Sequence, residues 1–139
     1  MIYIEHLNLV VKDIPAALSF YQGAFPHWKV RESGEGLWSG KPRKWVHFGD
    51  DHQYLTFNDN GVGEARGLGG HQPGLAHFAF VITNLDALIK RMEAAGFSVD
   101  KDGADEQWRK NVYYIDSDGF EVEFVEYLSD IPARRNASS

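Results

Sequence analysis

The chain has 139 residues, 43% of them hydrophobic, which is enough for one compact domain but short for two independent ones. Its 20 acidic and 14 basic side chains give a formal charge of -6, which argues against nucleic acid as a partner. The sequence has no cysteine and no apolar stretch of the roughly 18 residues that a membrane span requires. We therefore expect a cytoplasmic protein without disulfides, thiolate metal ligands or a membrane partner.

The first half of the chain predicts a strand, a helix and three further strands. The helix follows Asp13, a typical N-cap residue, and its apolar positions recur at the three- and four-residue spacing of a one-sided helix. Residues 49–51 predict the turn between the last two strands. The predicted elements are a strand at 2–11, a helix at 14–25 and strands at 28–31, 43–48 and 53–58.

Residues 60–74 contain six glycines and one proline, and we interpret them as a linker. After the linker the same order of elements returns, and Asp116 to Gly119 predicts a hairpin turn. The polar segment 129–139 is expected to be a flexible tail. The predicted elements of this half are a strand at 75–82, a helix at 85–95, a short strand near 97–100 and a hairpin of 111–116 with 120–127.

The two halves are copies of one pattern. The segment from His6 to Asp13 recurs from His77 to Asn84, and the apolar positions of the two following helices correspond. The repeat predicts an α+β fold in which two tandem βαβββ units form curved sheets around a cavity. A single domain is expected over 1–128, with unit one at 1–60 and unit two at 75–128.

Strand alternation predicts which side chains face that cavity. When the apolar residues of a strand pack on the helix, the residues between them point to the other side of the sheet. This places His6, His77 and Glu123 on the side away from the helices, together with Tyr54. Two histidines and a carboxylate are therefore expected to converge in the cavity.

Three motifs resemble the vicinal oxygen chelate superfamily, which includes glyoxalases, extradiol dioxygenases, fosfomycin-resistance transferases and bleomycin-resistance proteins. Ser117 stands where that family usually has proline, and Phe120 where it has asparagine. The resemblance implies that the two repeat histidines and the last glutamate bind a divalent metal, so that the ligands are His6, His77 and Glu123. The motifs are His6-Leu-Asn-Leu-Val-Val, Gly74-Leu-Ala-His77-Phe-Ala-Phe and Asp116-Ser-Asp-Gly-Phe-Glu-Val-Glu123-Phe.

Two imidazoles and one carboxylate with open coordination positions suit Fe(II), Mn(II), Ni(II) or Zn(II). Glyoxalase-like relatives add a fourth ligand, usually glutamate, in the first unit at the position equivalent to Glu123. We align Tyr54 with that position, and a tyrosine is a poor ligand unless strongly acidified. The resemblance then favours the three-ligand classes, extradiol dioxygenases and fosfomycin-type thiol transferases, and leaves the catalytic residue unassigned.

Four residues are candidates for substrate binding. Tyr54 and Tyr113 are expected to line the cavity, and either could act as an acid or base, as could His47. Trp108 and Arg109 precede the metal-bearing hairpin and either cover the mouth of the cavity or form a solvated loop. The partner implied by these residues is a small molecule with oxygen donors.

Two functions stay open at the level of sequence. One is a metalloenzyme that chelates two neighbouring oxygens of a small substrate, of dioxygenase, glyoxalase-like lyase or thiol-transferase type. The other is a metal-free binding protein that sequesters a small molecule, as bleomycin-resistance relatives do. The resemblance also implies a homodimer, in which each cavity is formed either within one chain or between two chains.

Overall fold

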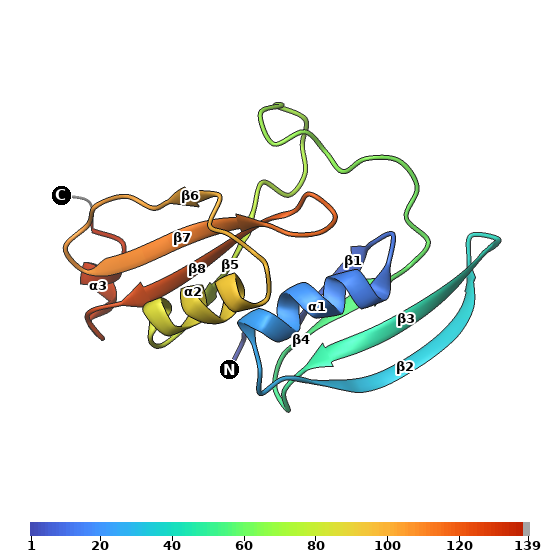
Figure 1. Cartoon of the computed structure of the whole chain (residues 1–139), viewed down its shortest axis with the longest axis horizontal. Coiled ribbons are helices and arrows are strands. Elements are labelled where there is room, and N and C mark those ends of the chain that lie inside the picture. The colour runs from blue at the N-terminus through green and yellow to red at the C-terminus, as the bar shows by residue number, and fades with distance from the viewer. Residues whose placement is uncertain (138–139) are drawn as a thin grey trace. The chain divides into compact units, whose positions relative to one another are not determined.

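The computed structural model describes residues 1–137, so the last two residues of the expected tail, 138 and 139, lie outside the described part. The chain divides into two compact units, Met1–Glu64 and a second that begins at Ala65 (Figure 1). This division falls inside the segment 60–74 that the sequence predicted as a linker. Each unit is described by itself.

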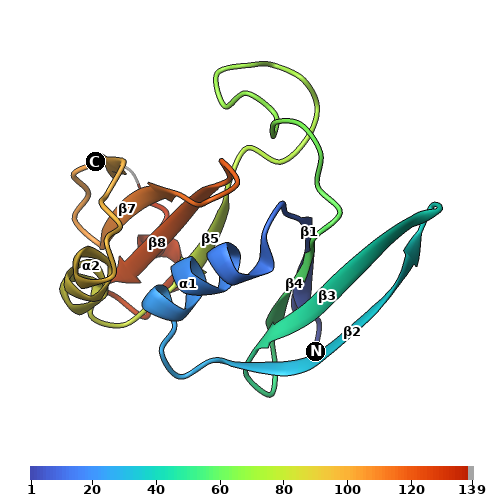
Figure 2. The same ribbon diagram turned by 45° about the vertical axis from the view of Figure 1, so that its right-hand side comes forward.

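The first unit has one helix and one four-stranded sheet with the order β1-β4-β3-β2. Strand β1 runs parallel to β4, and β3 is antiparallel to both β4 and β2. The helix lies against β3 and β4 and covers one face of the sheet (Figures 1 and 2). The elements are β1 (His6–Val10), α1 (Ile14–Ala24), β2 (Lys29–Trp38), β3 (Lys41–Gly49) and β4 (Tyr54–Asn58).

Helix α1 forms where the sequence predicts it because its start is capped and one side of it is apolar. The side chain of Asp13 accepts a hydrogen bond from the backbone N–H of Ala16 at 3.2 Å. Phe20 and Tyr21 are fully buried, and the Tyr21 ring stacks on Phe57 of β4 with 5.5 Å between ring centres. Burial of each such side chain contributes roughly 1.5–3 kcal/mol, so this contact holds the helix on the sheet.

The second unit repeats the arrangement with a sheet of order β5-β8-β7-β6. Strand β5 is parallel to β8, and β7 is antiparallel to both β8 and β6. These two tandem βαβββ-like modules, each with a mixed four-stranded sheet, confirm the α+β fold class. The elements are β5 (Phe78–Val81), α2 (Leu85–Ala94), β6 (Lys101–Asp102), β7 (Arg109–Ile115), β8 (Glu121–Tyr127) and α3 (Pro132–Arg135).

Helix α2 is attached to the sheet at its first turn. The side chain of Asn84 caps the N–H of Ala87 at 3.1 Å, and the Glu126 carboxylate of β8 accepts the N–H of Leu85 at 2.8 Å. Leu88 and Met92 of the helix are fully buried. No helix within residues 1–137 is long and apolar enough to cross a membrane.

The boundaries differ most from prediction at β2. The sequence predicted a short strand at 28–31, but β2 continues to Trp38 and forms a long hairpin with β3 (Figure 2). Gly34 and Gly36 interrupt the apolar alternation of this strand, and Ser39 and Gly40 make its turn with positive φ angles of 47° and 81°. Similarly, the short strand expected near 97–100 begins only at β6.

Candidate metal centre

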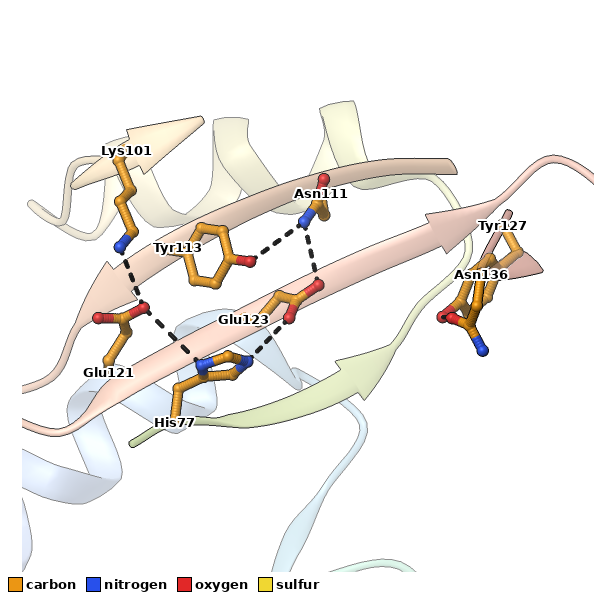
Figure 3. A network of polar contacts seen from close by, with 8 residues as sticks. All are labelled: His77, Lys101, Asn111, Tyr113, Glu121, Glu123, Tyr127 and Asn136. Atoms are coloured by element: carbon orange, nitrogen blue, oxygen red, sulfur yellow. Dashed lines mark hydrogen bonds and ion pairs between the residues drawn. The ribbon is translucent and has the colours of Figure 1, made fainter. Parts of the chain in front are cut away.

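His77 and Glu123 lie side by side in the second unit. His77 directly precedes β5, and the parallel pairing of β5 with β8 sets Ala79 opposite Glu123. The Nε2 atom of His77 is 3.2 Å from the Oε1 atom of Glu123 (Figure 3). The Glu123 side chain is 14% exposed, whereas that of His77 is 39% exposed. The imidazole is therefore accessible, and the carboxylate is held within the sheet.

This spacing fits two ligands of one divalent metal. Two donor atoms bound at about 2.0–2.2 Å, and separated by about 90–110° at the metal, lie about 3.0–3.5 Å apart. The observed 3.2 Å between Nε2 of His77 and Oε1 of Glu123 falls in that range. An imidazole and a carboxylate are also ligands that Mn(II), Fe(II) and Zn(II) accept. These two residues thus fit a metal without rearrangement.

The second oxygen of Glu123 has a different partner. The Asn111 side chain of β7 donates a hydrogen bond from Nδ2 to Oε2 of Glu123 at 3.0 Å. Tyr113, two residues further along β7, makes a T-shaped ring contact with His77, with 5.5 Å between centres. Burial, and after it the charge of Glu123, raise the pKa of Tyr113 above its ordinary value. The Tyr113 phenol therefore stays protonated at neutral pH and can donate a hydrogen bond.

A second carboxylate, Glu121, lies on the other side of His77. Its Oε1 atom is 4.0 Å from Nδ1 of His77 and 3.4 Å from Nζ of Lys101 on β6 (Figure 3). The Lys101 ammonium also lies over the Tyr113 ring, 4.8 Å from its centre. The charge of Glu121 is therefore balanced by a lysine, whereas Glu123 faces His77 and the amide of Asn111.

A pocket of about 270 Å³ opens beside Glu121. Its wall is formed mainly by the segment that precedes His77, together with the β7–β8 turn, and it is largely apolar. Arg66 shapes this segment by donating hydrogen bonds to the backbone oxygens of Gln72 and Gly70 at 2.9 and 2.7 Å. The lining residues are Ala65, Arg66, Leu68, Pro73, Gly74, Leu75, Ala76, Gly119, Phe120 and Glu121.

In the first unit, His6 has its own carboxylate and aromatic partners. Its Nδ1 atom lies 2.9 Å from Oε1 of Glu5, and the same oxygen accepts the Tyr54 hydroxyl at 3.3 Å. In the tautomer that donates Nδ1–H to Glu5, the Nε2 lone pair of His6 is free for a metal. The Tyr54 ring stacks on His6 with 4.7 Å between centres and 5° between planes.

This stack continues across the sheet as an aromatic column of four rings, His6, Tyr54, His47 and Trp45. The spacings from Tyr54 to His47 and from His47 to Trp45 are 4.6 and 4.8 Å. Desolvation, followed by the charge of Glu5, raises the pKa of Tyr54, which disfavours a phenolate ligand. Burial lowers the pKa of His47 against the opposing charge of Glu32, so this imidazole is neutral at neutral pH.

The strand register corrects the alignment of Tyr54 with Glu123. His6 pairs with Tyr54 and Asn8 with Thr56, whereas Ala79, the counterpart of Asn8, pairs with Glu123. The residue equivalent to Glu123 is therefore Thr56, and Tyr54 corresponds to Glu121.

The turns that precede β4 and β8 indicate the same equivalence of Thr56 with Glu123. Asp50 and Asp116 each begin a turn with side-chain hydrogen bonds to backbone N–H groups, and Asp50 N–H bonds to the Gln53 oxygen as Asp116 N–H does to the Phe120 oxygen. The second turn is one residue longer, so Gln53 corresponds to Phe120 and Tyr54 to Glu121. Thr56, 7% exposed, thus places a neutral hydroxyl at the position equivalent to Glu123.

Trp108 and Arg109 contact the end of the described chain. The Trp108 ring lies under the guanidinium of Arg134, 4.7 Å from its centre, and Arg109 donates to the backbone oxygens of Arg135 and Ala137 at 3.3 and 3.4 Å. Of the predicted substrate residues, only Tyr113 is brought to His77 and Glu123, and Tyr54 is brought to His6. The role of all four in substrate binding stays a prediction.

Among residues 1–137, no three His, Cys, Asp or Glu side chains form a cluster that could hold a metal by themselves. His6 belongs to the first unit, and His77 with Glu123 to the second. Sequence reasoning missed Asn111, Lys101 and Glu5 as neighbours of these ligands. Alternation along β7 places Asn111 on the same face as Tyr113, and that signal was available in the sequence.

Comparison with known proteins agrees with this architecture. Residues 3–124 match the model of the Glyoxalase/Bleomycin resistance protein/Dioxygenase superfamily. No curated protein matches the chain at a significant level.

Several solved structures share the fold at low identity. A glyoxalase family protein from Enterococcus faecalis is 21% identical, with a TM-score of 0.71 over 89% of this chain and 97% of that one. A glyoxylase/bleomycin resistance protein/dioxygenase domain from Frankia sp. EAN1pec is 20% identical, with a TM-score of 0.72 over 91% and 98%. The E126Q mutant of the fosfomycin resistance protein FosX from Listeria monocytogenes, complexed with Mn(II) and 1S,2S-dihydroxypropylphosphonic acid, is 21% identical, with a TM-score of 0.66 over 96% and 98%. The repeated βαβββ architecture and the match over residues 3–124 show that the chain belongs to the Glyoxalase/Bleomycin resistance protein/Dioxygenase superfamily.

Proposed function

We propose that this protein is a divalent-metal-dependent enzyme that binds a small substrate through two neighbouring oxygens at a site made by His6, His77 and Glu123. The observation that carries the proposal is the 3.2 Å contact between Nε2 of His77 and Oε1 of Glu123, which has the spacing of two ligands on one ion. The ligands of the Listeria FosX structure, Mn(II) and a dihydroxypropylphosphonic acid, support this class of metal and substrate.

His6 completes the proposed set because it occupies the place of His77 in the other copy of the repeat. His6 is the first residue of β1 and His77 directly precedes β5, and each of these strands pairs in parallel with the last strand of its unit. Its side chain is 42% exposed, so the ring is accessible. The homodimer implied by the family resemblance is part of the proposal, and His6 is supplied either by the same chain or by a second copy.

Three protein ligands leave coordination positions for the substrate. When bound, the metal would polarise the two substrate oxygens and stabilise negative charge on them. Tyr113 keeps its proton because burial and Glu123 raise its pKa, so it would donate a hydrogen bond to a substrate oxygen beside His77. The apolar pocket next to Glu121 would take the carbon skeleton of a small substrate.

Mn(II) titration of the purified full chain tests the site. Free Mn(II) is followed by its electron paramagnetic resonance signal, and we expect near-stoichiometric binding by the wild type. Glu123→Gln keeps the shape but removes the charge of the ligand, and we expect the Mn(II) Kd to rise by more than about 100-fold, beyond the loss typical of an outer-shell change.

The matched control is Glu126→Gln on the same strand. Glu126 points to the helix side and accepts the N–H of Leu85, which a glutamine oxygen can also do. We expect this variant to bind Mn(II) as the wild type does. No binding of Mn(II), Fe(II), Ni(II) or Zn(II) by the wild type would leave the metal-free sequestering protein as the better interpretation. Equal Mn(II) binding by wild type and Glu123→Gln would show that Glu123 is not a ligand.

A further inference from the structure

We infer that Asn111 is the positioning residue of Glu123, holding one carboxylate oxygen so that the other is presented toward His77. The inference rests on the proposed function, because Glu123 is its metal ligand. Asn111 has no contact with substrate in this role and acts through the carboxylate.

The two oxygens of Glu123 have separate partners. Oε2 accepts the hydrogen bond from Nδ2 of Asn111 at 3.0 Å, and Oε1 faces Nε2 of His77 at 3.2 Å (Figure 3). An amide donor on one oxygen restricts rotation of the carboxylate about its last bond. Oε1 is therefore the oxygen left for a metal, and binding through one oxygen keeps a further coordination position for the substrate.

The carboxamide of Asn111 lies directly against Gly103. The N–H of Gly103 donates to the backbone oxygen of Asn111 at 2.8 Å, and the Asn111 side chain fills the space that a Cβ at position 103 would occupy. Any residue larger than glycine at 103 would overlap with the carboxamide and displace it. Gly103 thus leaves the space that the carboxamide of Asn111 occupies beside Glu123.

The oxygen atom of the same amide also indicates that Asn111 is present for its hydrogen bond to Glu123. Within residues 1–137, the Oδ1 atom of Asn111 is buried without a hydrogen-bond partner. A buried unsatisfied oxygen is unfavourable, so packing alone would be better served by an apolar side chain of the same size. The polar atom of this amide that has partners is Nδ2, which donates to Oε2 of Glu123 at 3.0 Å and, over a longer 3.5 Å, to the Tyr113 hydroxyl.

The equivalent position in the first unit lacks the carboxamide. Asn111 pairs with Val125 in β8 as Trp45 pairs with Asn58 in β4, so Trp45 is its counterpart. The position equivalent to Glu123 in that unit is Thr56, which has no carboxylate to position. The amide donor therefore occurs in the copy of the repeat that carries the acidic ligand.

The test compares Mn(II) binding by Asn111→Ala, Asn111→Leu, Gly103→Ala and the Asn111→Ala/Gly103→Ala double variant. Each single variant is expected to raise the Mn(II) Kd about 10- to 100-fold, the range for loss of an outer-shell partner. Because Gly103→Ala acts by displacing the Asn111 amide, the double variant should bind no more weakly than Asn111→Ala. Asn111→Leu keeps the branched shape of the side chain without its polar atoms and provides a second variant if the alanine leaves a cavity.

Lys110→Ala is the control on the same strand. Lys110 faces the other side of the sheet and pairs with Asp86 at 3.8 Å, so its loss should leave the Mn(II) Kd unchanged. Thermal unfolding of each metal-free variant separates lost stability from lost binding, since a purely structural role would lower the Tm without changing the Kd.

The outcomes distinguish the inference from the proposed function. If wild type binds Mn(II), Glu123→Gln does not, and the Asn111 variants bind as wild type, only the inference is overturned. Multiplicative losses in the Asn111→Ala/Gly103→Ala double variant would also overturn it, because the two residues would then act independently. If the wild type binds no divalent metal, both fall together.

Discussion

The two units of this chain share one backbone frame and place different chemistry on it. Both have a histidine at the start of the parallel strand pair and an aspartate that begins the turn before the last strand. Around these shared points the side chains differ in kind. The equivalent pairs, first unit then second, are Tyr54 and Glu121, Thr56 and Glu123, His47 and Tyr113, and Trp45 and Asn111.

The consequence is that the first unit stacks its histidine in a column of rings, whereas the second places two carboxylates of its last strand beside its histidine. His6 stacks in the aromatic column, whereas His77 contacts Glu123 and lies near Glu121. The side chains of the first unit and those of the second fit the same pattern of strand alternation and turns, because both units place apolar residues on the helix side of the sheet. The repeat therefore determines where side chains point, and the residue at each place determines what the unit can bind.

The strongest test of this comparison removes each histidine in turn. If both units supply a ligand, His6→Ala and His77→Ala should each raise the Mn(II) Kd by more than about 100-fold, since a direct ligand contributes more than an outer-shell group. The measurement is the Mn(II) titration by electron paramagnetic resonance, with thermal unfolding of the metal-free proteins alongside. Loss in His77→Ala with unchanged binding in His6→Ala would mean that the second unit binds the metal alone.

A smaller effect is expected from restoring the missing carboxylate of the first unit. Thr56→Glu places an acidic side chain at the position equivalent to Glu123, and an added charged ligand should tighten Mn(II) binding by about tenfold. Tyr54→Glu is the matched control, because the register places that residue opposite His6 and equivalent to Glu121. If Tyr54→Glu tightened Mn(II) binding and Thr56→Glu left the Kd unchanged, the strand equivalence that the register indicates would be contradicted.

The smallest expected effect is a pH dependence of the free energy of unfolding, caused by His47 in the aromatic column. Burial holds the pKa of His47 below its ordinary value of 6.5, so below that pH the unfolded chain takes up a proton that the folded chain does not. The free energy of unfolding should therefore fall as the pH is lowered through about 6.5 toward the folded-state pKa of His47.

His47→Gln removes this contribution. Urea unfolding of the metal-free protein, from about pH 7.5 to about pH 5.5, should show a shallower loss of stability in the variant than in the wild type. The other histidines are common to both proteins and cancel in the difference. An equal or steeper loss in His47→Gln would mean that the folded state does not hold this imidazole neutral.

Much of the fold was predictable because its signals are local. The capping residues Asp13 and Asn84, the spacing of apolar residues after them and the turn at Asp116 each depend on a few neighbouring residues. The extension of β2 to Trp38 was missed because two glycines weaken the strand signal, and the pairing with β3 that maintains it is not local.

For the candidate site, the sequence by itself determined that His77 and Glu123 point to one side of a sheet and that His6 is the counterpart of His77. These statements follow from the repeat and from alternation, which are properties of sequence order. The partner of each ligand was decided only by the tertiary structure, since Asn111 reaches Glu123 across paired strands and its place depends on the absence of a side chain at Gly103. The equivalence of Thr56 with Glu123 was likewise decided by strand register, because register is set by hydrogen bonds between strands that are distant in sequence.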